Sequence, residues 1–192
     1  AGAVNHIVSE LGDYVVVKPA RQRSALGVTL IDNDNQLHEA VEKAFKLDNR
    51  LLVEQRVDGK EVTVGVIDTD EGCKAFPVID IITPEDSWYD YEHRYTVGLS
   101  EHIMPAVLPD EQTDHLQKYA IAAHQSLGCR DLSRADFIVD GENIYLLEVN
   151  TLPGMTPTSL YPDGAAGYGL NFVELVSYLV ERAANRQPIS KL

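Results

Sequence analysis

The chain has 192 residues, of which 44% are hydrophobic and 24% charged, a balance typical of a soluble globular protein with a core of its own. Its net charge of −14 argues against general nucleic-acid binding, because phosphate backbones repel an acidic surface. The longest apolar runs, such as Val15–Val17 and Ile144–Leu147, are far too short to cross a membrane. A nucleotide remains compatible with this charge, since one triphosphate needs only a few local cations and a metal ion.

Cysteine and histidine usage gives no sign of a metal or redox motif. The two cysteines, Cys73 and Cys129, are far apart and in no metal-ligand or redox spacing. The six histidines are scattered, and none stands in a paired ligand spacing. We therefore expect two reduced thiols in a cytoplasmic protein. Residues 1–5 have no signal-peptide pattern, and the missing initiator methionine indicates a fragment or a processed chain.

The first part of the chain alternates β-branched runs with one helical pattern. Residues Asp13–Lys18 predict a buried strand that stops at Pro19. A small polar loop separates this strand from Val28–Ile31, so the two predict a hairpin. The apolar spacing of Gln36–Leu47 predicts a helix.

Two more strands, Leu51–Gln55 and Glu61–Ile67, are predicted around the turn pair Asp58-Gly59. The first lobe is therefore strands with at least one helix. We place its end near the second of these strands, which gives predicted domains at residues 1–65 and 66–192.

The second lobe begins with a predicted strand at Phe76–Ile82. Residues Thr83–Ser100 show no clean period, and we expect a long functional loop that is the least ordered internal segment when no nucleotide is bound. Pro109-Asp110 opens a predicted helix that runs to Leu127 and stops at Gly128.

The last part predicts two strands and a capped helix. Asp136–Val139 and Ile144–Asn150 are the strands, joined by a turn at Asp140-Gly141. Asn171 and Glu174 form a pattern typical of a capping box at the start of the final helix. The predicted apolar face of this helix consists of Phe172, Leu175, Val176 and Leu179.

Two carboxylates and one amide give the strongest chemical signal. Glu148 and Asn150 are two apart on a strand, so their side chains share one face. With a hairpin loop at residues 141–143, Asp136 lies opposite Glu148 on the partner strand. Hard oxygen ligands of this kind suit Mg²⁺. We expect the oxygens of the three side chains to lie around a common point.

The alternative is that Asp136 and Glu148 are solvated residues on the polar face of an amphipathic hairpin. The flanking runs Phe137–Val139 and Tyr145–Leu147 are almost wholly apolar, which predicts strands that are buried on both faces. Buried carboxylates repel one another and need a partner. A metal ion removes both difficulties, so we favour the metal site.

Three further segments carry weaker signals, each with a plain structural alternative. Thr151–Leu160 is an irregular loop whose hydroxyl and N–H groups suit a carboxylate or an oxyanion, or it is an ordinary connection. Lys18 precedes the small-residue loop Ser24–Gly27 and suits a phosphate, or it is a surface lysine. Leu52–Val57 suits adenine and Glu61 suits ribose, or the two belong to a hairpin with solvated charges.

These segments together, in this order and spacing, resemble the D-alanine–D-alanine ligases of the ATP-grasp superfamily. The resemblance covers nearly the whole chain from Asp13 onward, and six ordered blocks carry it. The blocks are residues 17–27, 53–55, 59–64, 89–95, 132–136 and 147–155.

The resemblance implies an α+β fold of the ATP-grasp type, in which two α/β lobes with antiparallel-rich sheets sandwich ATP. It also implies an ATP-dependent, ADP-forming ligase. One D-alanine carboxylate attacks the γ-phosphate to give an acyl phosphate, and the amine of a second D-alanine then displaces phosphate. The dipeptide serves peptidoglycan synthesis, and so cell-wall biogenesis and cell shape.

The resemblance implies nucleotide and metal roles at the matching positions of this chain. The implied ATP-binding positions are Lys18 at the α- and β-phosphates, Ser24 in the closing loop, Glu54, Gln55 and Val57 at adenine, Glu61 at ribose, and also Ile138 and Asn150. The implied metal ligands are Asp136, Glu148 and Asn150, which would hold two Mg²⁺ ions that bridge the phosphates, with Mn²⁺ as a substitute.

The resemblance also implies catalytic and substrate roles. Arg134 and the Gly154 N–H would stabilise the tetrahedral oxyanion. The positions that would bind the carboxylate of the second D-alanine are Ser159 and Leu160, with Gly154. In the long loop, Arg94 would reach the γ-phosphate and Tyr95 would help to close the site.

The chain departs from the family's pattern in three respects. Arg94 stands where many members have a lysine, which keeps the charge but changes its geometry. The loop after Lys18 lacks the family's more usual glycine, and this loss stiffens it. The family's amino-terminal domain and the first part of its central domain lie before Ala1. We therefore expect a fragment that binds Mg-ATP weakly and forms no dipeptide, because the groups for the first D-alanine are missing.

Two alternatives stay open at this point. The first is a sister ligase that joins D-alanine to D-lactate or D-serine. Tyr95 favours the D-alanine–D-alanine ligase, whereas the neighbouring His93 is compatible with the D-lactate enzyme. The second is an ATP-grasp nucleotide-binding module without ligase activity. The expected partners are D-alanine and the missing amino-terminal domain, with neither nucleic acid nor membrane, and the full-length protein can form a homodimer under this reading.

Overall fold

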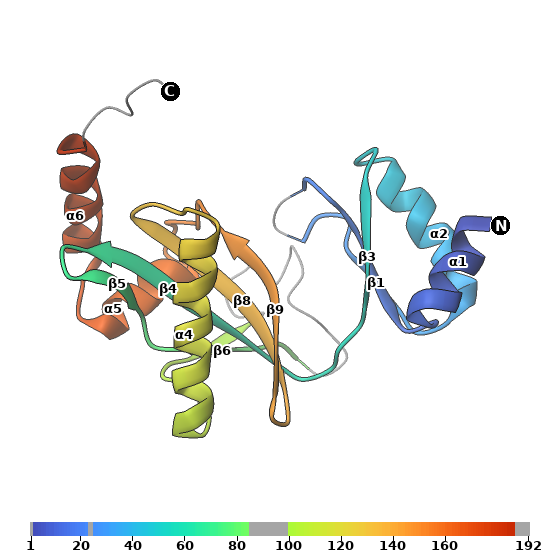
Figure 1. Ribbon diagram of the computed structural model, residues 1–192, viewed down its shortest axis with the longest axis horizontal. Coiled ribbons are helices and arrows are strands. Elements are labelled where there is room, and N and C mark those ends of the chain that lie inside the picture. The colour runs from blue at the N-terminus through green and yellow to red at the C-terminus, as the bar shows by residue number, and fades with distance from the viewer. Residues whose placement is uncertain (1, 23–24, 85–99, 187–192) are drawn as a thin grey trace. The chain divides into compact units, whose positions relative to one another are not determined.

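The computed structural model describes residues 2–22, 25–84 and 100–186 (Figure 1). The chain divides into two compact units, of which the first takes in residues 2–58 and the second residues 59–82 and 101–186. The division after Asp58 lies ahead of the boundary predicted at residue 65. The reason is that β4 (Lys60–Thr69) pairs along most of its length with strands of the second unit.

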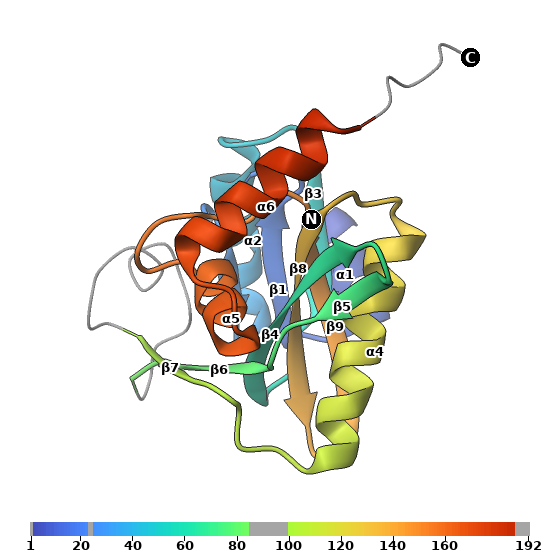
Figure 2. The same ribbon diagram turned by 90° about the vertical axis from the view of Figure 1, so that its left-hand side faces the viewer.

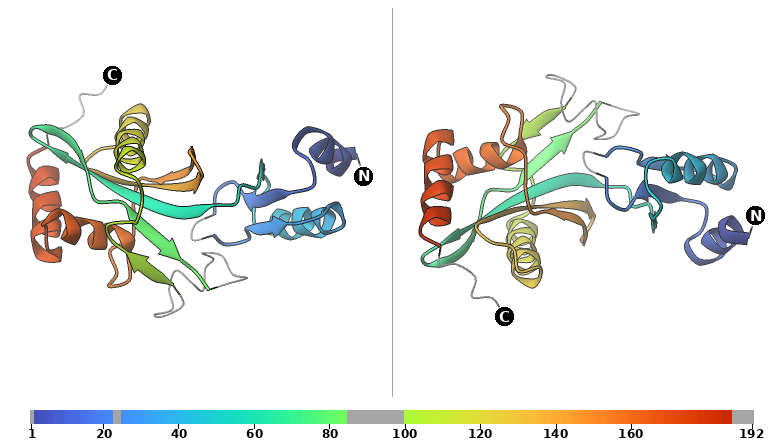
Figure 3. Two further views of the ribbon diagram at one scale, coloured as in Figure 1. Left: turned by 90° about the horizontal axis from the view of Figure 1, so that it is seen from below. Right: turned by 90° about the horizontal axis from the view of Figure 1, so that it is seen from above.

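The first unit is a three-stranded antiparallel sheet with two helices packed on it (Figure 3). The strand order is β2-β1-β3. In chain order the elements are α1 (Gly2–Leu11), β1 (Val15–Pro19), β2 (Thr29–Ile31), α2 (Asp34–Phe45) and β3 (Leu51–Gln55). The predicted hairpin and the predicted helix are confirmed. Helix α1 is absent from the sequence-based prediction, and it packs through the apolar residues Val4, Ile7, Val8 and Leu11.

The two strands predicted around the turn pair Asp58-Gly59 are present, but they do not form a hairpin, so the alternative of a hairpin with solvated charges is wrong. Strand β3 pairs with β1 in the first unit, whereas β4 pairs with strands of the second. Asp58 accepts a hydrogen bond from the Tyr14 hydroxyl at 2.6 Å. A Cβ at Gly59 would collide with the backbone oxygen of Val139. The glycine therefore serves a close backbone approach.

The second unit is a six-stranded sheet in which every pairing is antiparallel. The path runs β7-β6-β4-β8-β9, and β5 pairs with β4 beside it. Besides β4, its strands are β5 (Gly72–Ala75), β6 (Ile79–Ile82), β7 (Glu101–Ile103), β8 (Leu132–Asp140) and β9 (Asn143–Asn150). Strand β6 is shorter than predicted, and β5 is absent from the prediction.

The helices of this unit cover opposite faces of the sheet (Figure 2). They are α4 (Asp110–Ser126), α5 (Leu160–Tyr168) and α6 (Phe172–Ala184). Successive side chains of a strand point to opposite faces, so Val62, Val64 and Val66 pack on the α4 side. On the other side, Ile67 packs with Tyr161 of α5.

Strand β9 corrects the expectation that both strands of the hairpin are buried on both faces. Strand β8 is buried along most of its length, but β9 is mostly exposed. Leu146 is 49% exposed and Tyr145 is 41% exposed. The physical reason is position, because β9 lies at the end of the strand path and β8 inside it.

The predicted α4 and the predicted capping box of α6 are confirmed. In α6 the Asn171 side chain accepts from the N–H groups of Val173 and Glu174, and Glu174 accepts from the Asn171 N–H. The predicted apolar face of α6 is only partly correct, since Leu175 is buried but Phe172 is 50% exposed. The longest helix described, α4, has 17 residues, and no helix in the described ranges is long and apolar enough to span a bilayer.

Replacement of Asn171 by alanine should destabilise the second unit by about 1 kcal/mol, because two N–H groups at the start of α6 lose their acceptor. Asn171→Ser keeps an oxygen acceptor and should change stability by no more than a few tenths of a kcal/mol. Urea unfolding of the three proteins measures the effect. Equal loss in both variants would show that the cap does not stabilise α6.

Candidate functional site

The β8–β9 hairpin brings the predicted metal ligands to one face of the sheet. Asp136 stands opposite Glu148, and Arg134 opposite Asn150, as the sequence predicts for the first pair. The Asn150 amide nitrogen donates to Asp136 Oδ2 at 3.2 Å and to Glu148 Oε1 at 3.3 Å. The oxygen-bearing groups of the three predicted ligands therefore converge.

The Asp136 carboxylate is almost fully buried, with 3% of the residue exposed. Arg134 binds it through two parallel hydrogen bonds, from Nε to Oδ1 at 2.9 Å and from Nη2 to Oδ2 at 2.7 Å. This fork compensates the buried charge within the protein. The argument that this carboxylate needs a metal ion for burial is thus wrong, although the set of ligands still suits one.

A magnesium ion fits the donors present on this face. Asp136 and Glu148 offer carboxylate oxygens, and a half-turn of the Asn150 amide would replace its nitrogen by its oxygen beside them. Glu148 is exposed and Asn150 half-buried, so water and phosphate oxygens can complete an octahedral shell.

Thr63 is a site residue that the sequence analysis missed. It stands opposite Asp136 on β4 and is buried, and its hydroxyl lies 2.6 Å from Asp136 Oδ1 and 3.1 Å from the Ala135 oxygen. It therefore fixes the carboxylate from the side away from β9. Its isolated sequence context, between two valines, gives no sign of this contact.

Two of the predicted nucleotide positions also meet on this face. Glu61 of β4 stands opposite Ile138 of β8. Glu61 and Thr63 are two residues apart on β4, and Asp136 and Ile138 are two residues apart on β8. Because every second side chain of a strand points to the same face, all four project to the same side. The predicted ribose position and one predicted ATP position therefore lie in line with the predicted metal ligands.

The other predicted nucleotide positions lie in the first unit. Lys18 of β1 forms an ion pair with Glu54 of β3, which joins the predicted phosphate and adenine positions. Gln55 ends β3 and is exposed, and Val57 follows it half-buried. Three predicted positions lie outside the described residues, namely Ser24, Arg94 and Tyr95, as does most of the loop predicted at 83–100.

The loop after β9 holds the predicted oxyanion and carboxylate positions together. The Ser159 hydroxyl accepts from the Thr156 N–H at 2.9 Å, and a Cβ on Gly154 would lie only 2.7 Å from it. Ser159 stands at the N-cap of α5, where unpaired N–H groups favour an anion. The Leu160 side chain is buried in the core, so this residue has only its backbone to offer a ligand.

A family model described as D-ala D-ala ligase C-terminus matches residues 2–181. The chain belongs to this family. The D-alanine--D-alanine ligase of Halalkalibacterium halodurans is 45% identical over 172 residues, which are 88% of this chain and 56% of that ligase. This member of the D-ala D-ala ligase C-terminus family therefore spans about half the length of its curated relatives.

Solved ligase structures share the fold. VanG D-Ala:D-Ser ligase from Enterococcus faecalis matches with a TM-score of 0.80 and 32% identity, over 94% of this chain and 52% of that one. The D-alanine--D-alanine ligase from Bacillus anthracis complexed with ATP matches with a TM-score of 0.77 and 27% identity, over 92% and 54%. The predicted α+β fold of the ATP-grasp type is confirmed.

Thr63→Val should weaken divalent-metal binding about 10- to 100-fold, the usual loss when a group that orients a ligand is removed. The valine methyl fills the space of the hydroxyl but leaves Asp136 without that donor. Thr63→Ser keeps the donor and should stay close to the unmutated protein. Calorimetric titration with Mn²⁺ measures both, and identical affinities in the two variants would contradict an orienting role.

Proposed function

We propose that the chain is the carboxyl-terminal, catalytic part of an ATP-dependent D-alanine–D-alanine ligase. The observation that carries this is the convergence of Arg134, Asp136, Glu148 and Asn150 on one face of the β4–β8–β9 sheet. Family membership and a curated relative at 45% identity support it. Because the chain spans 56% of that relative, the whole enzyme would also need an amino-terminal region.

Each unit contains residues that the family resemblance assigns to the nucleotide. Lys18 is paired with Glu54, and its ammonium group can exchange this partner for phosphate oxygens, since a lysine side chain is flexible. The freed Glu54 carboxylate can then accept from the adenine amino group. Glu61 offers acceptors to ribose hydroxyls, and Ile138 beside it offers an apolar surface to the base.

The metal would be Mg²⁺, held by Asp136, Glu148 and Asn150. When bound, it neutralises charge on the β- and γ-phosphates. The protein's own part is to hold these three ligands and the Arg134 fork in a fixed arrangement. Thr63 and the buried position of Asp136 supply that rigidity.

The reaction would run in two steps. The carboxylate of the first D-alanine attacks the γ-phosphorus and releases ADP, which leaves an acyl phosphate. The amine of the second D-alanine attacks the acyl carbon, loses a proton, and expels inorganic phosphate. Arg134 and the Gly154 N–H would stabilise the oxyanion between attack and expulsion. The product would enter peptidoglycan synthesis in the cytoplasm, where ATP is available.

A D-alanine–D-serine ligase is the second candidate. The fold matches VanG D-Ala:D-Ser ligase at 32% identity, but curated D-alanine--D-alanine ligases reach 45% identity, so the first candidate is favoured. The α5 N-terminus with Ser159 and Leu160 would bind the second substrate's carboxylate, which D-alanine and D-serine share, so these residues do not separate the two. D-Lactate also carries this group.

The substrate test is phosphate release from ATP by the full-length protein that contains this chain. D-Alanine alone should support turnover, and D-alanine with D-serine or D-lactate should give little mixed product. Mass spectrometry identifies the dipeptide or depsipeptide. A mixed product in excess over D-alanyl-D-alanine would assign the second candidate, and absence of any D-alanine-dependent turnover would contradict a ligase.

Arg134→Ala should lower kcat about 10²- to 10³-fold, because one donor to the developing oxyanion is lost. Arg134→Lys keeps the charge beside Asp136 but not the fork, so it should fold well and still lose much of kcat. The exposed Arg130, just ahead of β8, provides the matched control, and Arg130→Ala should leave kcat unchanged. Equal rates for all four proteins would remove Arg134 from catalysis.

A further inference from the structure

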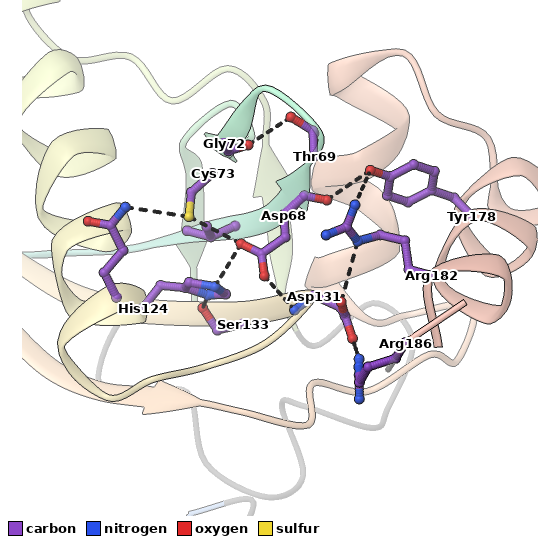
Figure 4. Close-up of polar contacts among 12 residues, drawn as sticks. Asp68, Thr69, Gly72, Cys73, His124, Asp131, Ser133, Tyr178, Arg182 and Arg186 are labelled. Atoms are coloured by element: carbon purple, nitrogen blue, oxygen red, sulfur yellow. Dashed lines mark hydrogen bonds and ion pairs between the residues drawn. The ribbon is translucent and has the colours of Figure 1, made fainter. Parts of the chain in front are cut away.

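A second cluster of ligand-forming side chains lies on the opposite face of the same sheet. It consists of Asp68 on β4, Cys73 on β5 and His124 on α4 (Figure 4). Along β4, Asp68 follows the alternation of the valines that pack against α4, whereas Thr63 points to the other face. The cluster is therefore separate from the metal ligands proposed around Asp136.

The sulfur and the imidazole nitrogen both lie close to one carboxylate oxygen. Cys73 Sγ lies 3.1 Å from Asp68 Oδ1, and His124 Nε2 lies 3.2 Å from the same oxygen. All three atoms lie within 4.8 Å of one another. A tetrahedral zinc ion with bonds of about 2.0–2.3 Å separates its ligand atoms by roughly 3.3–3.8 Å. Small side-chain shifts would bring the cluster to that spacing.

Neighbouring groups hold each ligand in place. The Asp131 N–H donates to Asp68 Oδ2 at 2.7 Å, which leaves Oδ1 for the cluster. His124 Nδ1 lies 2.7 Å from the hydroxyl of the fully buried Ser133. Asp68 and Cys73 are also direct partners in the β4–β5 pairing. Such supporting hydrogen bonds are what fixes ligand orientation in metal sites.

Burial of the cluster leaves one side open. His124 is 1% exposed, whereas Asp68 and Cys73 are half-buried. An ion can therefore enter past the β4–β5 side, while the imidazole closes the inner side. A water molecule on the open side would supply a fourth ligand.

We propose that Asp68, Cys73 and His124 form a Zn²⁺ site with three protein ligands and one water. The mixed oxygen, sulfur and nitrogen set suits zinc and does not suit Mg²⁺, which prefers oxygen. On binding, Cys73 releases its proton to solvent, and the Cys73 thiolate and the Asp68 carboxylate together neutralise the dication. His124 binds through the Nε2 lone pair and donates its Nδ1–H to the Ser133 hydroxyl.

The site ties three elements together and takes no part in the ligase reaction. It fastens the β4–β5 pair to α4, close to Asp131, which Arg182 of α6 also contacts. Without a cation, burial and the hydrogen bond to Asp68 raise the pKa of the Cys73 thiol. The competing arrangement is thus a thiol–carboxylate–imidazole hydrogen-bond network with no ion.

Cobalt substitution distinguishes the two arrangements in the chain itself. Metal-free protein titrated with Co²⁺ should develop a near-ultraviolet thiolate-to-cobalt charge-transfer band at one equivalent, and Zn²⁺ should bleach it. The oxygen ligands around Asp136 cannot produce this band. Cys73→Ser should abolish it, and Cys129→Ser, the matched control with the other thiol, should retain it.

Two measurements on the unmutated chain guard against a folding artefact. Zn²⁺ should slow alkylation of Cys73 at least 10-fold, as followed by peptide mass spectrometry, and it should raise Tm.

Asp68→Asn should weaken Co²⁺ binding at least 10-fold. No charge-transfer band in the unmutated chain would overturn the proposal. A band that survives Cys73→Ser and disappears in Cys129→Ser would overturn it as well.

Discussion

The antiparallel pairing of β4 with β8 organises the second unit. It runs from the pair Lys60 and Val139 to the pair Ile67 and Leu132 without interruption, and it places the two strands inside the sheet, with other strands on both flanks. Because side chains alternate along each strand, Val62, Val64 and Val66 pack on the α4 face, and the polar residues of the site lie on the other face. A slip of one residue would exchange the two faces and destroy both.

The polar face contains a buried ion pair, Arg134 with Asp136, that the packing of the fold does not need. Arg134 and Asp136 are both nearly buried, and taking such charges out of water costs several kcal/mol per ion before their attraction offsets it. A hydrophobic pair of similar volume would commonly be as stable. The fork holds the Arg134 guanidinium and both Asp136 carboxylate oxygens in a fixed geometry beside Glu148 and Asn150, which suits the proposed reaction. Thr63 adds a neutral donor at no cost in charge.

The two faces of the sheet differ in the chemistry that their side chains can support. Oxygen ligands collect on the Asp136 face, where a phosphate-binding hard cation would sit. Sulfur and imidazole groups collect with Asp68 on the α4 face. The register of β4 with β5 sets the contact between Asp68 and Cys73, and the packing of α4 brings His124 to them. No spacing of these residues along the chain indicates that contact, since they come from three separate elements.

Local patterns were enough for the features whose partners lie nearby in sequence. The hairpin turn after Asp140 sets Asp136 opposite Glu148, and the cap at Asn171 needs only residues within one turn. Family resemblance supplied the ATP-grasp fold, and it also supplied the proposed nucleotide positions, which the spacing alone left open. The sequence did not predict the features that depend on distant neighbours. These include the position of β9 at the edge of the sheet and the close approach of the Val139 backbone to Gly59. Burial and pairing partners are set by which strands meet in space, and alternation along one strand carries no information about the strand beside it.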